Sequence, residues 1–236
     1  MIGIFSKTID PNLSKIAGLA GLDFIILDME HGISNLRDIQ NHINYSNSLD
    51  IKSYVRIESA DSKNIHKILE LEPNGIMVPN VMDYNHWKEI KRRLHFHPKG
   101  DRGICRFVPA ANFGNTPIKE YFSKENSKKI ILQIEGTKSL LDIESFIEDS
   151  EIDTIFIGPY DLSQSLGIPG EIDNPLLELK IKEIVKSCNS KKKRVGLFVD
   201  NHKQIKKWRN AGINFIACSV DYNIYLEALK QIIKNK

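Results

Sequence analysis

The chain has 236 residues, of which 41% are hydrophobic and 27% are charged, and its formal net charge at pH 7 is +3. This length fits one large domain of ordinary globular composition, and so small a charge argues against an extended nucleic-acid-binding surface. Neither a signal peptide nor a membrane span is indicated, because no apolar run approaches the roughly 18 residues that a span needs, and we expect a cytoplasmic protein.

Short apolar runs alternate with amphipathic stretches along the whole chain. The runs are too short for helices and rich in β-branched and aromatic residues, which is typical of strands buried on both faces. The stretches between them repeat apolar residues at helical spacing, and several begin at a pair that favours helix initiation, such as Asp10-Pro11 or Asn174-Pro175. The eight runs, in chain order, are Ile2–Phe5, Phe24–Leu27, Ser53–Val55, Gly75–Val78, Ile130–Ile134, Thr154–Ile157, Arg194–Val199 and Phe215–Cys218.

Eight strands, each followed by a helix, predict a TIM (β/α)8 barrel. The alternative is a doubly wound open sheet, but that fold usually has fewer strands and a glycine-rich turn after the first one. No linker, repeat or low-complexity segment marks a boundary, so residues 1–236 are expected to form a single barrel domain. Two connections, residues 95–127 and 158–174, are long, which in compact domains is typical of functional loops.

Polar side chains gather directly after four of the predicted strands. In TIM barrels the C-terminal ends of the strands hold the active site, so these residues are the candidates for chemistry. They lie in segments 28–32, 56–58, 133–135 and 158–163, which carry carboxylates, a histidine and an arginine. By spacing alone they indicate an active site of unspecified chemistry.

Four of these side chains suit one kind of reaction. Glu135 and Asp161 follow neighbouring strands, so their carboxylates can converge on one cation, and oxygen ligands of this kind suit Mg²⁺ or Mn²⁺. Such a metal can chelate the carboxylate and keto oxygens of a 2-oxo acid and stabilise its enolate as a Lewis acid. Arg56 offers a bidentate fork for a carboxylate or for charge developing on oxygen, and a histidine such as His31 can move a proton near neutral pH.

A structural role explains the same residue types. Carboxylates at strand ends often cap helices or form ion pairs. Asp28, Glu30 and Arg56 could therefore form a ring of ion pairs that closes the barrel mouth. The residues alone do not separate this interpretation from a catalytic one.

Several short stretches, in order and at the predicted strand ends, match the motifs of one protein family. The most specific is Phe156–Ser163, which is followed by Gly167–Gly170. The other stretches are Gly3–Ser6, Ala20–Phe24, Asp28–His31, Val55-Arg56, Met77–Val81, Pro98–Gly103 and Gln133–Glu135. Taken together, they make the chain resemble, nearly from end to end, the HpcH/HpaI aldolase family, the pyruvate-dependent class II aldolases related to citrate lyase β-subunits.

The resemblance implies a barrel of the phosphoenolpyruvate/pyruvate-domain type. It also implies an aldolase that reversibly cleaves a 4-hydroxy-2-oxo acid, of the 2-keto-3-deoxy acid type, into pyruvate and an aldehyde. Glu135 and Asp161 would bind the divalent metal (Mg²⁺, Mn²⁺ or Co²⁺), His31 would be the general base acting on the substrate hydroxyl, and Arg56 would stabilise the transition state. The implied substrate-binding residues are Arg56, Gln133, Gly158, Pro159, Tyr160 and Asp161.

Two residues depart from the family pattern at the end of the third predicted helix. The family has an Asp that supports the catalytic histidine of an adjacent subunit, and this chain has Glu70, so the carboxylate is kept with a longer reach and is expected to be catalytic. The Gly expected two residues later is Glu72, which leaves the local turn open. The resemblance also implies a homo-oligomer, a hexamer or a trimer, in which Tyr222–Lys236 packs on a neighbouring subunit.

Other functions are open to a chain of this kind. A Schiff-base aldolase is disfavoured, because it needs a desolvated lysine in the barrel mouth and only Lys7 follows a strand closely. An acyl-CoA lyase of the citrate lyase β type shares the barrel and the metal, but those chains are usually longer. A non-catalytic relative that binds a keto acid is disfavoured by the presence of all four candidate residues. The expected partners are a small 2-oxo acid and an aldehyde, with no nucleic acid and no membrane.

Overall fold

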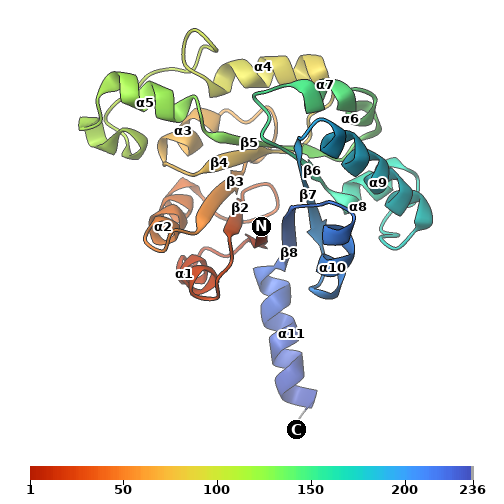
Figure 1. Cartoon of the computed structure of the whole chain (residues 1–236). Helices are drawn as coiled ribbons and strands as arrows, with labels where there is room; N and C mark the ends of the chain where they lie inside the picture. The colour runs from red at the N-terminus through yellow and green to blue at the C-terminus, as the bar shows by residue number, and fades with distance from the viewer. Residues whose placement is uncertain (235–236) are drawn as a thin grey trace.

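The computed structural model, which describes residues 1–234, is a closed barrel of eight parallel strands (Figure 1). Each strand pairs with the next along the chain, and β8 pairs with β1 to close the barrel. The predicted TIM barrel is confirmed, and every predicted run is a strand. The strands are β1 (Ile2–Ser6), β2 (Phe24–Asp28), β3 (Lys52–Arg56), β4 (Gly75–Val78), β5 (Lys129–Ile134), β6 (Thr154–Ile157), β7 (Arg194–Val199) and β8 (Phe215–Val220).

Helices fill the connections between the strands, and the two long connections contain short helices of their own. Residues 95–127 include the 3-10 helix η1 (Pro109–Gly114) and α5 (Ile118–Glu125), and residues 158–174 include α8 (Pro159–Ser165). The Asn174 side chain accepts a hydrogen bond from the backbone N–H of Leu176 at 2.9 Å and so caps α9, as the sequence predicts. The remaining helices are α1 (Asn12–Leu19), α2 (Leu36–Asn47), α3 (Ile65–Glu70), α4 (Tyr84–Leu94), α6 (Thr137–Leu141), α7 (Ile143–Glu148), α9 (Pro175–Ser190), α10 (Lys203–Asn210) and α11 (Asp221–Lys234).

Aromatic side chains pack the inside of the barrel. Phe24 and Phe215 stack with their ring centroids 3.9 Å apart, and Phe5 meets the Phe156 ring edge-on at 6.0 Å. Gly3 lies against this cluster, where a Cβ would come within 2.4 Å of the Phe24 ring, so no larger residue fits there without a shift. These rings fill the inside of the barrel below the C-terminal ends of the strands.

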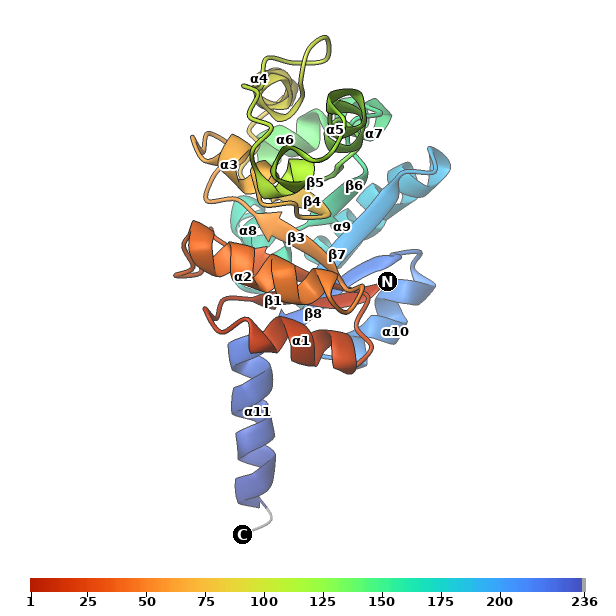
Figure 2. The same cartoon turned by 90° about the vertical axis from the view of Figure 1, so that its left-hand side faces the viewer.

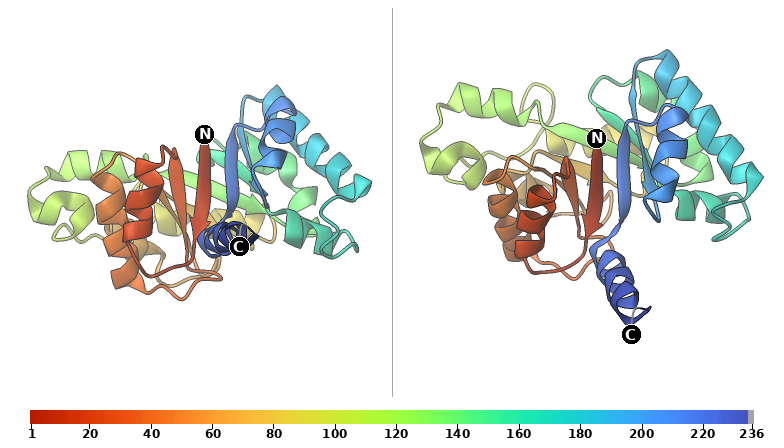
Figure 3. Two further views of the ribbon diagram at one scale, coloured as in Figure 1. Left: turned by 90° about the horizontal axis from the view of Figure 1, so that it is seen from below. Right: turned by 60° about the horizontal axis from the view of Figure 1, so that its bottom comes forward.

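The C-terminal helix α11 projects away from the barrel instead of packing along it (Figures 1 and 2). Seen from below, it is viewed nearly end-on beside β1 and β8 (Figure 3). None of the described helices is long and apolar enough to cross a membrane. The exposed apolar side chains of α11 are Tyr222, Ile224, Tyr225, Leu226, Leu229, Ile232 and Ile233. The segment expected to pack on a neighbouring subunit is thus largely this helix, while its residues 235–236 lie outside the described part of the chain.

The turn after α3 forms although it lacks the glycine of the family pattern. Glu72 takes up a φ of 70°, in the left-handed region, and its N–H donates to the carbonyl of Leu69 at 3.3 Å. The Glu72 carboxylate contacts the ammonium of Lys124. A non-glycine residue in this conformation costs about 1–2 kcal/mol, so the turn is kept at the expense of local strain.

Candidate active site

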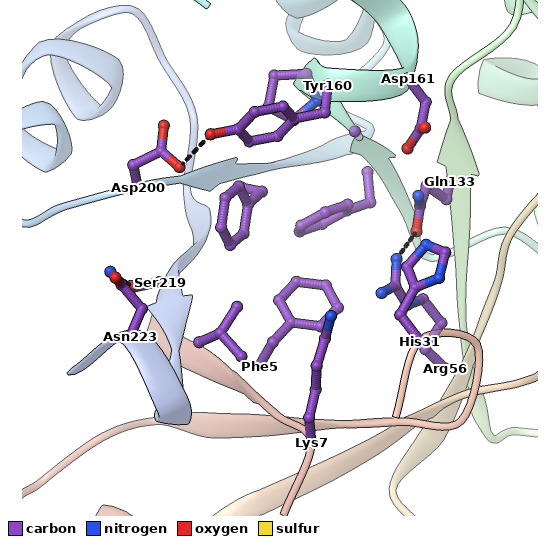
Figure 4. Close-up of a pocket in the computed structure, with 15 residues that line it drawn as sticks. Phe5, Lys7, His31, Arg56, Gln133, Tyr160, Asp161, Asp200, Ser219 and Asn223 are labelled. Carbon is purple, nitrogen blue, oxygen red and sulfur yellow. Dashed lines mark hydrogen bonds between the residues drawn. The ribbon is translucent and has the colours of Figure 1, made fainter. Parts of the chain in front are cut away.

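A cavity of about 580 Å³ opens over the C-terminal ends of the strands (Figure 4). It lies at the rim where the sequence places the site, and most of the predicted site residues line it. These are His31, Arg56, Gln133, Gly158, Pro159, Tyr160 and Asp161. The residues that sequence reasoning did not select lie mainly on β1, β7 and β8 and on the start of α11, and they are Phe5, Lys7, Phe156, Phe198, Asp200, Ser219, Val220 and Asn223.

Arg56, at the end of β3, is buried against two carboxylates from the end of the neighbouring β2. Its Nε donates to Oδ1 of Asp28 at 2.9 Å, and its Nη2 donates to Oδ2 of the same residue at 2.7 Å. Its Nη1 lies 3.0 Å from Oε2 of Glu30 and donates a longer hydrogen bond, 3.4 Å, to Oε1 of Gln133. The ion pairs expected among Asp28, Glu30 and Arg56 are therefore present. They do not close the barrel mouth, because Arg56 still lines the cavity.

The charge of Arg56 sets the protonation of its nearer partner. Burial alone would raise the pKa of Asp28, but the hydrogen bonds and charge of Arg56 hold that pKa below its ordinary value. For Glu30, burial outweighs the opposing effect of Arg56 and raises the pKa. Asp28 therefore provides a fixed negative charge that holds Arg56 in one orientation.

His31 lies at the open edge of the same group, with 58% of its side chain exposed. Its Nε2 is 3.9 Å from Oε2 of Glu30, and its backbone N–H donates to Oδ1 of Asp28 at 3.2 Å. The turn after β2 thus presents the imidazole to the cavity beside Arg56 (Figure 4). An imidazole in this position can exchange a proton with a bound molecule.

Glu135 is a buried carboxylate that faces other carboxylates. It accepts hydrogen bonds from the backbone N–H of Asn80 and from the side-chain amide of Gln133. Burial raises its pKa to about 7 in spite of the Asn80 N–H, and the negative charges of Glu30 and Asp161 add to the increase. A cation bound beside Glu135 and Asp161 would offset this repulsion.

Glu135 and Asp161, which follow β5 and β6, are the carboxylates that could hold a divalent cation. Among residues 1–234 no group of three or more His, Cys, Asp and Glu residues could hold a metal ion by itself. Mg²⁺ is often held by one or two carboxylates, with its remaining positions filled by water and substrate.

Asn80 is a further residue near this site whose role the sequence did not single out. It lies just after β4 with a φ of 57°, and this left-handed conformation directs its N–H to Glu135 and its side-chain amide to Oε1 of Glu30 at 2.6 Å. Gly158 completes the pocket wall, because a Cβ there would approach Nε2 of Gln133 to 3.1 Å and Oε2 of Glu135 to 3.5 Å. A side chain at position 158 would therefore crowd the Gln133 amide and the Glu135 carboxylate.

The opposite wall of the cavity comes from the last two strands. The Tyr160 hydroxyl donates to Oδ1 of Asp200 at 2.7 Å, and burial together with this carboxylate raises the pKa of Tyr160 to about 12. Asn223 donates to the Ser219 hydroxyl at 2.9 Å. Asp200 directly follows β7, so the rule that selected the other strand ends would also have found it.

Two predicted site residues, Glu135 and Glu70, do not line the cavity. Glu135 is hydrogen-bonded to Gln133, which does line it. Glu70 ends α3, and its charge acts on Tyr121 instead. The expected role of Glu70 involves the histidine of an adjacent subunit, so its position in one chain is compatible with that role and does not test it.

Comparisons with known proteins add a family and its relatives. A model of the HpcH/HpaI aldolase/citrate lyase family matches residues 1–228. The chain is 25% identical over 231 residues to a hydroxypyruvate/pyruvate aldolase of Agrobacterium fabrum, covering 98% of this chain and 87% of that protein. It is also 25% identical over 230 residues to a 2-keto-3-deoxy-L-rhamnonate aldolase of Klebsiella pneumoniae, with coverages of 97% and 85%. The structure of a HpcH/HpaI family protein from Burkholderia cenocepacia superposes with a TM-score of 0.93 at 24% identity and covers 100% of this chain and 93% of that one.

Proposed function

Because the chain belongs to the HpcH/HpaI aldolase/citrate lyase family, whose members are carbon–carbon lyases, we propose that it is a metal-dependent aldolase that reversibly cleaves a 4-hydroxy-2-oxo acid into pyruvate and an aldehyde. One observation carries the proposal. The buried Glu135 feels the charges of Glu30 and Asp161 and has its pKa raised to about 7, and its hydrogen-bond partner Gln133 lines the cavity together with Arg56, His31 and Asp161. That combination suits a cation and a 2-oxo acid bound side by side.

Glu135 and Asp161 would hold Mg²⁺, Mn²⁺ or Co²⁺. When bound, the cation would supply Lewis acidity towards the carboxylate and keto oxygens of a 2-oxo acid. The Gln133 amide and the backbone N–H groups of Tyr160 and Asp161 would hold the pyruvate part of the substrate. Gly158 and Pro159 shape the wall against which it lies.

The remaining residues act on protons and charge. In the cleavage direction, His31 would take the proton of the C4 hydroxyl, the bond between C3 and C4 would break, and its electron pair would remain on the pyruvate part as the enolate. The aldehyde forms at C4 and leaves, and C3 is then protonated to give pyruvate. Arg56, fixed by Asp28, would stabilise the negative charge that develops on oxygen.

Pyruvate release from a panel of 4-hydroxy-2-oxo acids tests this function. The panel should vary the tail beyond C4, since the two aldolase relatives are named for different substrates. Activity that disappears with EDTA and returns with Mg²⁺, Mn²⁺ or Co²⁺ would support the proposal. Absence of activity together with intact metal binding would favour an acyl-CoA lyase or a non-catalytic keto-acid-binding protein on the same barrel.

We also propose that the chain assembles with copies of itself through α11. The helix exposes a row of apolar side chains, and Asp221 is its only buried residue within the described part of the chain. A free helix of this kind is stabilised by packing its apolar face on another surface. Sedimentation of the wild-type chain should show a hexamer or trimer, while Leu226→Lys with Leu229→Lys should shift it towards monomers.

A further inference from the structure

Lys7 enters the cavity from a rigid base at the end of β1. Its backbone N–H donates to Oδ2 of Asp221 at 2.9 Å, and its carbonyl accepts from the Tyr222 hydroxyl at 3.0 Å. Both partners belong to the first turn of α11. These two hydrogen bonds fix the backbone of Lys7. Its side chain points into the cavity from the wall opposite Tyr160 and Asp161 (Figure 4).

The ammonium group of Lys7 has little to bind within its own chain. Its one ion pair among residues 1–234 joins Nζ to Oδ2 of Asp28 across 3.8 Å, which is too long for a hydrogen bond. Asp28 is already bound at both oxygens by Arg56. Arg56 therefore balances the charge of Asp28 without the help of Lys7.

Arg56 is the other permanent cation of the cavity, and three of its five N–H groups donate within the chain. Its Nε and Nη2 donate to Asp28 and its Nη1 donates to Gln133, while Glu30 lies beside Nη1 as an ion-pair partner. Lys7 adds a second positive charge on another wall, with 26% of its side chain exposed and no hydrogen bond from its Nζ to residues 1–234. A partly shielded ammonium with free donors is a binding group for an anion.

We propose that Lys7 binds an anionic group, a carboxylate or a phosphate, at the far end of the aldehyde half of the substrate. The inference rests on the proposed aldolase function, in which the 2-oxo acid end is held beside Gln133 and Asp161. Lys7 reaches the cavity from a different wall, so it meets the other end of a substrate that spans the mouth (Figure 4). The enzyme would therefore prefer aldehydes with a charged tail to neutral aldehydes of equal length.

A binding experiment tests the tail without requiring catalysis. In titration calorimetry with Mg²⁺ present, 2-oxoglutarate should bind wild type roughly 10- to 100-fold more tightly than 2-oxopentanoate, which has the same length and a neutral tail. Lys7→Gln should remove this difference, and Lys7→Arg should restore part of it. The control Lys15→Gln, on the outer face of α1, should keep the wild-type difference.

Kinetic pairs identify the source of the anion. In aldol addition to pyruvate, succinic semialdehyde is compared with butanal, and glyceraldehyde 3-phosphate with glyceraldehyde. For each pair, kcat/KM of the charged aldehyde is divided by kcat/KM of the neutral one. The pair with the larger ratio in wild type identifies the carboxylate or the phosphate, and Lys7→Gln should lower that ratio roughly 10- to 100-fold. Circular dichroism of each variant shows that the barrel is folded.

The outcomes separate this inference from the aldolase proposal. Metal-dependent aldol activity with equal binding of charged and neutral tails, or with an unchanged ratio in Lys7→Gln, would overturn the role of Lys7 alone. A charge preference that depends on Lys7 in a protein without aldol activity would overturn the aldolase and keep the anion site. Covalent trapping of pyruvate on Lys7 by borohydride would overturn both, because it would make Lys7 a Schiff-base nucleophile.

Discussion

Arg56 and Asp28 form a two-point ion pair across β2 and β3, with Nε to Oδ1 at 2.9 Å and Nη2 to Oδ2 at 2.7 Å. The two residues are also register partners in the parallel pairing of these strands. The planar fork of an arginine matches a carboxylate in a way that the single ammonium of a lysine cannot. The orientation of the cation, and not only its charge, is therefore built into the barrel.

Arg56→Lys tests this orientation. The substitution keeps the charge but loses the fork, so we expect kcat for pyruvate release to fall on the order of 100-fold. Arg92→Lys, which alters an exposed pair with Asp101, is the matched control and should retain wild-type turnover. Wild-type kcat in Arg56→Lys would show that charge alone is sufficient.

Glu135→Gln and Asp161→Asn test the metal site. Each replaces one carboxylate by an amide of the same shape, and each should weaken Mn²⁺ binding at least about 100-fold and abolish pyruvate release. Calorimetric titration with Mn²⁺ measures the first effect without a substrate. Glu171→Gln removes an exposed acid from the same connection and should bind Mn²⁺ as wild type does. Undiminished Mn²⁺ affinity in both site variants would exclude these residues as ligands.

His31→Ala tests the general base. Loss of a positioned base should lower kcat roughly 10²–10⁴-fold, while Mn²⁺ affinity changes little because the imidazole is not a proposed ligand. Turnover and calorimetric titration on the same preparation separate the two quantities. A parallel loss of both would make His31 a metal ligand instead.

Asn80→Gly and Asn80→Ala separate two roles of one residue. Both remove the amide from Glu30 and should lower turnover, but glycine tolerates the φ of 57° and alanine does not. Alanine should therefore cost about 1–2 kcal/mol more of the free energy of unfolding, measured by urea denaturation. Equal stabilities would contradict the strained conformation, and wild-type turnover in both would contradict the link to Glu30.

Asp149 should make the stability of the chain depend on acid. It lies after α7, and its Oδ2 accepts from Lys91 at 2.7 Å, from Trp87 at 2.9 Å and from Tyr84 at 3.1 Å. Burial alone would raise the pKa of Asp149, but the hydrogen bonds, that of Lys91 first, lower it below the ordinary value. The ionised carboxylate therefore stabilises the folded chain fully above the unfolded pKa of about 4, and this stabilisation is lost as the pH falls through the lower pKa of the folded state.

Asp149→Asn measures that contribution. At pH 7 the variant should be about 2 kcal/mol less stable to urea than wild type, and the difference should narrow as the pH falls below about 4. Glu148→Gln changes a neighbouring exposed carboxylate that pairs with Lys191 and should leave the unfolding midpoint where it is. A difference that stays constant down to pH 3 would rule out ionisation as its source.

The sequence predicts the barrel well because its strands are covered on both faces and therefore read as short apolar runs. The sequence also predicts where most of the candidate site residues lie. Because parallel strands of a barrel end on one rim, residues at the ends of β2, β3, β5 and β6 line one cavity. The single-domain assignment of residues 1–236, the cytoplasmic location and the catalytic roles stay predictions.

Other parts of the site depend on conformation that no residue pattern announces. Asn80 acts through a left-handed backbone, and nothing in one asparagine after a strand indicates that its N–H turns to a glutamate 55 positions away. Lys7 follows a strand, but only the three-dimensional contacts reveal that its nearest carboxylate, Asp28 at 3.8 Å, already accepts hydrogen bonds from Arg56 at both oxygens. The role that the resemblance implies for Glu70 involves the histidine of a second subunit, and it stays a prediction.

The Asp221 carboxylate joins the segment after β1 to the start of α11 by hydrogen bonds. Its Oδ2 accepts from the Ser6 hydroxyl at 2.8 Å and from the N–H groups of Lys7 and Thr8 at 2.9 and 3.1 Å, while Asp221 itself is the first residue of α11. A partner that rotates α11 must either break these hydrogen bonds to Asp221 or move residues 6–8 together with the helix. If subunits assemble through α11 as proposed, the contact surface lies directly beside the segment that carries Lys7 into the cavity.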